Sequence, residues 1–379
     1  GLTPAAHGVL PSPDRTRGFA NPGDHVAVRG SGREVMLAET LAAAGYRTAA
    51  VTEGAWVSPR FGFDQGFRWY RYALAGGPTA TRIATTADLR EFGRRGPFFL
   101  FVHSYTTHQP CHAPKPYRLK YGDSRHVGLA WPAARVPAAD YRWLHVSVFP
   151  AAPGDVVAFR DLHDGQINHA DTLVGAIVEE LKRDGLYDST VIVVTSDHGE
   201  DICDRSVLDH GDTLFEEVTH VPLVIRAPGA VKEARVVEQT ASTAGLAATI
   251  LDLAGLGSKH GTGSSLRPLW EGQGGARPAF AESIGRGSDA LAACRDGTSK
   301  HVRRETPQGA RQEWLFDLAA DPGERTNLAG ARAGELGRLR ALYDAHLAEA
   351  GKIRATLDTT VLQLDEEEVE RLKSLGYVR

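Results

Sequence analysis

The sequence predicts an α/β fold: a doubly wound, mostly parallel sheet flanked by helices, with a smaller C-terminal α+β subdomain. Three observations predict it. Helical segments alternate with short apolar strands, two of these strands run directly into polar loops, and short strands suited to antiparallel pairing appear beyond residue 273. We therefore expect a larger α/β domain over residues 1–272 and a C-terminal subdomain over residues 273–379.

Two helix–strand units support the parallel sheet. Residues 33–44 place apolar side chains on one helical face, Gly45 ends that helix, and residues 46–52 have the pattern of a short strand. Residues 159–185 form the clearest amphipathic helix, which leads into the apolar run Val191–Val194. Another apolar helix is expected over residues 244–254.

Polar side chains follow two of the expected strands. The run Val191–Val194 has the length and β-branched content of a buried strand, and it stops at Ser196-Asp197-His198-Gly199-Glu200. Residues 97–103 form the other strand, which ends in a loop that contains His108. Because ligands bind at the carboxyl ends of strands in open parallel sheets, both loops are candidate sites. A second His-Gly pair, His210-Gly211, follows before the next expected strand at residues 221–225.

Each of these residues also has a purely structural interpretation. Asp197 and Glu200 have the spacing of a helix capping box, while His108, His210 and His220 suit ordinary loop or strand-edge positions. The histidines at 103, 108 and 112 resemble a zinc set, but Pro110 breaks any helix that would align the last two.

Composition excludes several classes of protein. The 379 residues are 42% apolar and 24% charged, with a net charge of −4, so no basic surface favours nucleic acid. No apolar window approaches the length of a membrane span, and the three cysteines match no disulfide or zinc spacing. Because the chain starts with Gly1, we expect that the biological N-terminus, with any signal peptide, lies upstream.

Two later segments complete the pattern. Residues 111–153 form a long irregular stretch with basic and aromatic side chains, which suits either a lid over an anionic substrate or a solvated surface loop. Residues 257–277 are rich in Gly and Ser and suit a domain boundary. Beyond them we expect antiparallel strands at 300–302 and 313–318, and helices over 334–349 and 365–375.

Several motifs, in the expected order, resemble the sulfatase family of the alkaline-phosphatase superfamily. They are LAETLAAAGYRTAAVTEG, PFFLFVHSYTTHQP, GLYDSTVIVVTSDHGE, HGDTLFEEVTHVPLVI and WLFDLAADPGERTNLAG. Together they cover nearly the whole chain, and their joint order is highly specific.

The resemblance implies a set of roles. Asp197 and His198 match paired metal ligands, His108 matches a histidine that contacts the transferred group or leaving oxygen, and His210 matches a position that binds the anionic ester. One divalent metal ion is implied, with Ca²⁺ favoured and Mn²⁺ or Zn²⁺ also suited to an imidazole ligand. The substrate would be a small anionic ester, and the family favours a periplasmic or secreted location.

The sequence departs from the family in two places. The nucleophile segment Cys-x-Pro-x-Arg or Ser-x-Pro-x-Arg does not occur, and residues 1–9 resemble the stretch that follows it, with Thr3 in the wrong part of the motif. Ala55 and Val57 stand where many arylsulfatase-like members have lysine and histidine. The second departure points away from that branch and leaves phosphoester or phosphonate-ester chemistry open.

Three functions therefore follow as hypotheses. The first is metal-dependent hydrolysis of sulfate esters by a chain that lacks its nucleophile and its first acidic metal ligands. The second is a phosphodiesterase, phosphonate monoester hydrolase or phosphoryl transferase of the same superfamily, and the third is a non-catalytic module. Because a hard divalent ion takes about six or more ligands, we expect these 379 residues to bind metal weakly and to show no turnover.

Overall fold

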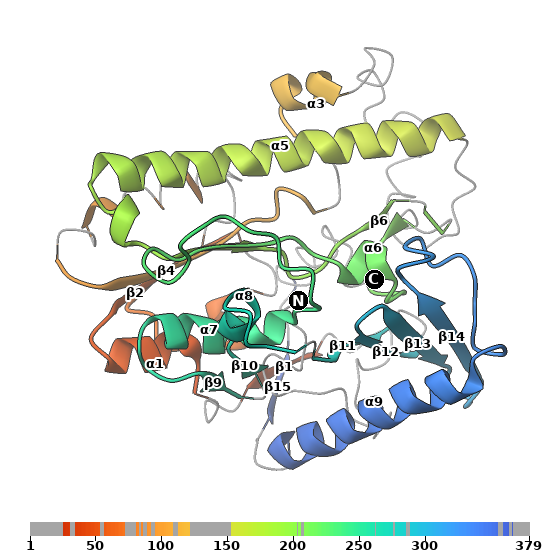
Figure 1. Ribbon diagram of the computed structural model, residues 1–379. Coiled ribbons are helices and arrows are strands. Elements are labelled where there is room, and N and C mark those ends of the chain that lie inside the picture. Colours follow the sequence, from red (N-terminus) through yellow and green to blue (C-terminus); the bar gives the residue numbers. More distant parts are fainter. Residues whose placement is uncertain are drawn as a thin grey trace. The chain divides into compact units, whose positions relative to one another are not determined.

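The computed structural model describes most of the chain in two compact units (Figure 1). The N-terminal unit comprises residues 21–190, 200–209 and 360–379, and the C-terminal unit comprises residues 1–20, 191–199 and 210–359. The described residues are 26–30, 35–53, 57–72, 81–82, 85, 89–91, 95–108, 113–121, 153–202, 204–205, 208–261, 263–275, 277–285, 289–354, 359–363 and 366.

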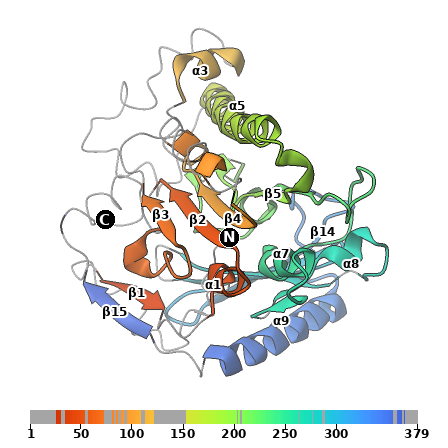
Figure 2. The same cartoon turned by 90° about the vertical axis from the view of Figure 1, so that its left-hand side faces the viewer.

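A three-stranded parallel sheet organises the N-terminal unit, with the order β3 (Trp69–Tyr72), β2 (Arg47–Thr52), β4 (Phe98–His103) (Figure 2). The central strand β2 consists mainly of small and β-branched residues, and its residues 49–51 are fully buried. This is the composition expected of a strand covered on both faces. The register pairs Thr52 with His103, so the carboxyl ends of β2 and β4 lie side by side.

Helix α1 (Leu37–Ala43) precedes β2 and confirms the first expected helix–strand unit. It begins later than the sequence pattern indicates. Met36 is the N-cap, and the Glu39 carboxylate accepts a hydrogen bond from the Met36 backbone N–H at 2.8 Å. This back-bond satisfies a donor that the first turn leaves free and fixes the start of the helix there.

Helix α5 (Pro153–Arg183) confirms the expected amphipathic helix and begins before the predicted start at residue 159. Helix α3 (Lys115–Tyr121) packs against it, with the Tyr117 ring stacked on His169 at 4.4 Å between centroids. Part of the segment predicted as irregular is therefore helical, because Tyr117 and Arg118 donate to the Pro114 carbonyl and start a turn. Residues 122–152 lie outside the described residues.

Short elements complete the N-terminal unit. β6 (Asp201–Ile202) and β7 (Leu208–Asp209) form an antiparallel hairpin, and β1 (Val26–Gly30) pairs with β15 (Thr359–Gln363). Two 3₁₀ turns lie at Pro59–Phe61 and Tyr187–Ser189. Because β6 rather than a helix follows Glu200, the capping-box interpretation of Asp197 and Glu200 is wrong.

The C-terminal unit begins with β5 (Ile192–Thr195), which pairs antiparallel with β8 (Leu223–Arg226). Both confirm expected strands, although β5 is half-buried where a buried strand was expected. β8 starts only after Pro222, which has no N–H for strand pairing. Between and after them lie α6 (Glu216–Thr219), the 3₁₀ turn Thr243–Gly245, α7 (Leu246–Leu253), β9 (Lys259–His260), β10 (Gly263–Ser264) and α8 (Arg267–Trp270).

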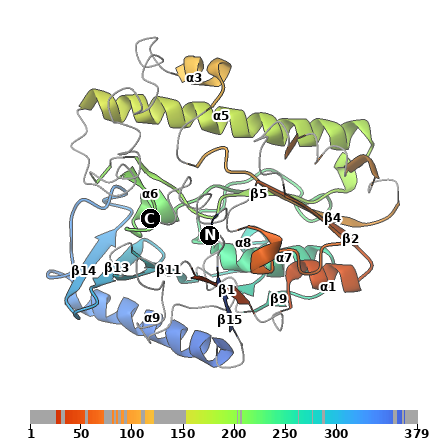
Figure 3. The ribbon, with the colours of Figure 1, turned by 180° about the vertical axis from the view of Figure 1, so that it is seen from behind.

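A four-stranded antiparallel sheet and one long helix form the rest of this unit (Figure 3). Its strands follow chain order: β11 (Ala279–Ile284), β12 (Ala290–Asp296), β13 (Ser299–Glu305) and β14 (Arg311–Asp317). The last two confirm and extend the expected strands, and α9 (Ala333–Arg354) contains the expected helix 334–349. The helix predicted over 365–375 lies outside the described residues, apart from residue 366.

The two faces of the antiparallel sheet contribute to two separate apolar clusters. One face packs on α9 through Leu315, Leu339 and Tyr343. The other face covers Leu214, a residue of the loop that follows His210, with Leu291 and Phe316. These observations confirm an α/β fold with a smaller C-terminal sheet subdomain, while the boundary at residue 272 stays a prediction. None of the helices in the described part of the chain combines the length and apolar character that a membrane span requires.

Candidate metal and anion site

His108 lies on a tight turn directly after β4. Its backbone N–H donates to the Tyr105 carbonyl at 2.9 Å, and its backbone carbonyl accepts a hydrogen bond from Gln166 Nε2 at 3.0 Å. The Tyr105 ring contacts the His108 imidazole edge-on, with 5.2 Å between ring centroids. His108 is only 8% exposed, so its orientation is set by packing on both sides.

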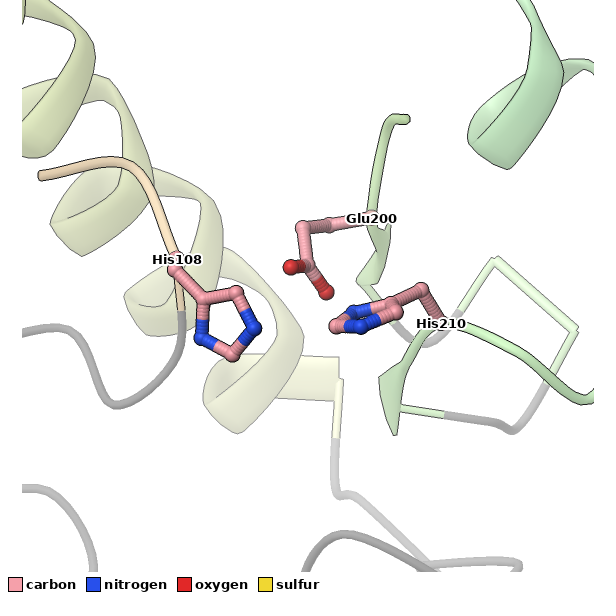
Figure 4. A group of neighbouring side chains, drawn as sticks. All are labelled: His108, Glu200 and His210. Carbon is pink, nitrogen blue, oxygen red and sulfur yellow. The ribbon is translucent and has the colours of Figure 1, made fainter. Parts of the chain in front are cut away.

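Glu200 is the acidic neighbour of His108 within the N-terminal unit. A carboxylate oxygen of Glu200 and a ring nitrogen of His108 lie within 4.8 Å of each other, a spacing compatible with two donors to one ion (Figure 4). Figure 4 also draws His210, which belongs to the C-terminal unit and is described with it. Glu200 has no site role among the predictions from the sequence, although its position in the polar loop after the run Val191–Val194 indicated one.

Helix α5 supplies two further polar side chains near this pair. Gln166 is 2% exposed, and its side-chain amide N–H donates a hydrogen bond to the His108 carbonyl. One turn earlier, burial lowers the pKa of His163. The negative charges of Glu200 and Asp164 raise this pKa, but their effect is smaller than that of burial. Both residues share one face of α5, because positions three apart are neighbours on a helix.

Asp197 and His198 lie at the end of β5 in the C-terminal unit. Asp197 Oδ1 accepts the His198 backbone N–H at 3.0 Å, and Asp197 Oδ2 lies 3.7 Å from His198 Nε2. One ion with bonds of about 2.1 Å could contact both atoms. His198 Nδ1 lies 3.0 Å from the Gly199 carbonyl oxygen, and a proton on Nδ1 would leave the Nε2 lone pair free for a metal.

Gly199 holds this strand end against α6. Its N–H donates to the Val218 carbonyl at 2.8 Å, and a Cβ at this position would collide with the Glu217 carbonyl oxygen. A side chain at residue 199 would therefore displace the loop that carries His198. The glycine of the Ser-Asp-His-Gly-Glu motif is explained by this close approach.

His210 is brought directly onto His198. The two imidazole rings stack with 3.9 Å between centroids and an interplanar angle of 26°. The next carbonyl, that of Gly211, accepts a hydrogen bond from the Ser283 hydroxyl at 3.0 Å. Within the C-terminal unit the fold thus places an expected metal ligand and an expected anion-binding histidine together.

The zinc set at residues 103, 108 and 112 is not assembled by the described residues. The Tyr105 ring contacts the His103 ring at 4.7 Å and the His108 ring at 5.2 Å between centroids. Residue 112 lies outside the described residues. His108 is grouped with Glu200 rather than with His103.

Comparison with known proteins places this chain in a family. The family model described as sulfatase matches residues 4–256. Choline-sulfatase of Rhizobium meliloti is 29% identical over 246 residues, which cover 62% of this chain and 47% of that protein. The chain spans about half the length of the curated relatives it matches.

Solved structures show the same fold at lower identity. One was determined in complex with its substrate D-glucosamine-2-N,6-O-disulfate; its TM-score is 0.70, its identity is 17%, and the match covers 92% of this chain and 88% of that one. The phosphonate monoester hydrolase of Agrobacterium radiobacter has a TM-score of 0.63 and 23% identity, and the match covers 85% of this chain and 82% of that one. The family match spans well over half of the residues, and the chain therefore belongs to the sulfatase family.

Proposed function

We propose that the protein carries the metal and anion site of a sulfate-ester hydrolase, with one divalent metal ion held through Asp197 and His198, and that the family's nucleophile is missing from these 379 residues. The observation that carries the proposal is the strand end of β5, where Asp197 Oδ2 and His198 Nε2 lie 3.7 Å apart and His210 stacks on the His198 ring. A carboxylate oxygen and an imidazole nitrogen 3.7 Å apart are suited to a divalent cation. A stacked imidazole beside them is suited to an anion.

The donor set bears on the metal. Carboxylate oxygens suit Ca²⁺, whereas the imidazole of His198 favours Mn²⁺ or Zn²⁺. We keep Ca²⁺ as the family expectation and propose Mn²⁺ and Zn²⁺ as the competitors to test. When bound, such an ion supplies positive charge against the ester oxygens.

The histidines carry the remaining roles. Negative charge grows on the leaving oxygen as a sulfate ester breaks, and an imidazole N–H can stabilise that oxygen or protonate it. We assign His108 to the leaving oxygen or the transferred group, and His210 to the anionic ester. Glu200, whose carboxylate lies within 4.8 Å of a His108 ring nitrogen, would orient that ring.

Phosphonate or phosphate esters are the second candidate, and one observation favours them. Val57 is buried, and its carbonyl accepts hydrogen bonds from Thr52 Oγ1 at 3.0 Å and from Tyr70 OH at 3.1 Å. The position that is a histidine in many arylsulfatase-like proteins is thus used here for packing. Residue 55 lies outside the described residues.

The first test of the proposal is binding, measured by calorimetry on the 379-residue protein. Mn²⁺ or Ca²⁺ is titrated first, followed by sulfate or methylphosphonate. We expect weak metal binding, and anion binding that requires the metal. Tighter binding of sulfate than of methylphosphonate supports sulfate-ester chemistry, and the reverse order supports the second candidate.

Assays with an aryl sulfate and an aryl phosphate complete this test. The sequence contains neither nucleophile segment of the family, so we expect no turnover of either ester. Metal-independent anion binding that survives loss of both Asp197 and His198 would contradict the proposed site. A periplasmic or secreted location remains a prediction from the family.

A further inference from the structure

The Glu53 carboxylate binds the turn that carries His108. Its Oε2 atom accepts hydrogen bonds from the Tyr105 backbone N–H at 2.7 Å and from Ser104 Oγ at 2.9 Å. Its Oε1 atom accepts a hydrogen bond from Thr81 Oγ1 at 2.7 Å. All of these residues belong to the N-terminal unit.

Strand register explains why this carboxylate reaches that turn. Thr52 at the end of β2 is paired with His103 at the end of β4. Glu53 and Ser104 are the next residues of the two neighbouring parallel strands, so they leave the sheet side by side. A carboxylate at residue 53 can therefore accept from the first donors of the turn, which have no strand partner beyond the sheet.

The contacts continue from Glu53 to His108 without a gap. Glu53 fixes the Tyr105 N–H, the Tyr105 carbonyl accepts the His108 N–H, and the Tyr105 ring packs on the His108 ring. From the opposite side, the buried Gln166 side chain holds the His108 carbonyl. Loss of Glu53 would free one of these two sides and leave the other intact.

We propose that Glu53 is a positioning residue for the site: it fixes the turn at residues 104–108 and thereby the direction of the His108 imidazole. The inference rests on the role assigned to His108 under the proposed function. Glu53 acts through Tyr105 and is not assigned a contact with substrate. Hydrogen bonds accepted by a carboxylate, such as that of Glu53, are of the stronger, charge-assisted kind.

Two substitutions at residue 53 separate hydrogen bonding from charge. Glu53→Ala removes every acceptor from the turn. Glu53→Gln keeps an amide oxygen for Tyr105 and Ser104, and its NH₂ group can donate to the Thr81 hydroxyl. Thr81→Val is the matched control, because it removes a hydrogen bond of similar length to the same carboxylate without touching the turn.

Amide hydrogen exchange at Tyr105 and His108 is the first readout, and it needs no ligand. We expect exchange at both amides to be at least about tenfold faster in Glu53→Ala, and within about threefold of the original protein in Glu53→Gln and Thr81→Val. Unchanged exchange in Glu53→Ala would overturn the inference. So would equal effects of Glu53→Ala and Thr81→Val, since these would indicate a general loss of stability.

Anion affinity in the presence of Mn²⁺ is the second readout. We expect Glu53→Ala to weaken sulfate binding about tenfold and Glu53→Gln to restore it to within about threefold. A Glu53→Gln protein as weak as Glu53→Ala would overturn the positioning role, because the charge itself would then matter. If Glu53→Ala does not fold, Ser104→Ala replaces it, with faster Tyr105 exchange as the expected result and unchanged exchange as the contradiction.

His108→Ala separates this inference from the proposed function. If His108→Ala leaves anion binding unchanged, the role of His108 is wrong, whatever Glu53 does to the turn. If His108→Ala abolishes binding while Glu53→Ala changes neither exchange nor affinity, the positioning role alone fails.

Discussion

Two strand ends carry candidate site residues, one in each unit, and they are held in different ways. The turn after β4 is half-buried, with His108 itself buried, and it is fixed by side chains from other elements, Glu53 at the end of β2 and Gln166 on α5. The loop after β5 is more open: the Asp197 side chain is 40% exposed and the His198 side chain 27%. This loop is held mainly by its backbone, because Gly199 approaches α6 closely and donates a backbone hydrogen bond to it.

This difference fits the chemistry assigned to each end. A histidine that meets a leaving oxygen needs one direction, which only a packed environment provides. Metal ligands need open lone pairs before the ion arrives, so partial exposure suits Asp197 and His198. The following predictions test this contrast, from the largest expected effect to the smallest.

The largest effect is expected at Lys300, which anchors α6 beneath the β5 end. Lys300 is 1% exposed, and its Nζ lies 2.8 Å from Glu216 Oε1 and 3.0 Å from Glu324 Oε1. Lys300→Met leaves the buried Glu324 carboxylate without its cation, while Glu216 keeps Arg295 at 2.8 Å, and should lower the free energy of unfolding by about 3–5 kcal/mol. Thermal and urea unfolding measure this change in the free energy of unfolding.

Lys182→Ala is the control for Lys300, because the Lys182–Glu179 pair lies on an exposed face of α5. Its loss should change the free energy of unfolding by less than about 1 kcal/mol. Comparable effects at Lys300 and Lys182 would mean that α6 does not depend on the buried ion network.

The next effect concerns the metal. His198→Ala removes one of two proposed ligands and should weaken Mn²⁺ binding by about 100-fold, on the order of 2.7 kcal/mol. Calorimetry measures the affinity. His220→Ala is the matched control in the same unit, because the His220 side chain is 72% exposed and has no metal role assigned. Equal losses in the two variants would remove His198 from the metal site.

Gln166→Leu tests the buried side of the contrast. It leaves the His108 carbonyl without its side-chain partner, which should cost about 1–3 kcal/mol of stability. Sulfate affinity should fall as well, because the turn loses its contact with α5, whereas Mn²⁺ affinity should stay unchanged. A variant that loses metal and anion affinity equally would indicate a general loss of structure and would contradict a local effect on the turn.

The smallest effect is the pH dependence of stability at His163. Burial lowers the pKa of His163 in the folded protein, so the unfolded chain binds the proton more tightly. The neutral, buried His163 therefore contributes its full share to the free energy of unfolding above the unfolded pKa of about 6.5. This share is lost as the pH falls below about 6.5 toward the lowered pKa of the folded state. His163→Gln should therefore flatten the acid side of the unfolding curve. If the free energy of unfolding of His163→Gln changed with pH between 6.5 and 5 as steeply as that of the original protein, this prediction would be contradicted.

The sequence could predict those parts of the fold that depend on local pattern. The strands ending at His103 and Thr195, the helix before β2 and the long helix α5 all follow from apolar periodicity and glycine stops. The proximity of His198 and His210 was implied by a family motif, and their rings do stack. Their catalytic and metal roles stay predictions.

Other features depend on tertiary contacts that no local pattern contains. Glu200 has capping-box spacing from Asp197, but the chain turns into the hairpin β6–β7 and the carboxylate lies near His108 instead. Helix α3 is short and forms against α5 through Tyr117 and His169. The role of Glu53 depends on the register of β2 with β4, which pairs residues 51 positions apart in the sequence.

The central claim is that His198, a proposed metal ligand, and His210, the proposed anion-binding histidine, act in one site at the end of β5, where their rings stack. A double-mutant cycle tests it most directly: sulfate affinity in the presence of Mn²⁺ is measured for the original protein, His198→Ala, His210→Ala and the double variant. Two residues of one site should show a coupling energy above about 0.5 kcal/mol, with the double variant weakened by less than the sum of the single changes. Strictly additive losses, or a loss at only one of the two histidines, would contradict the account.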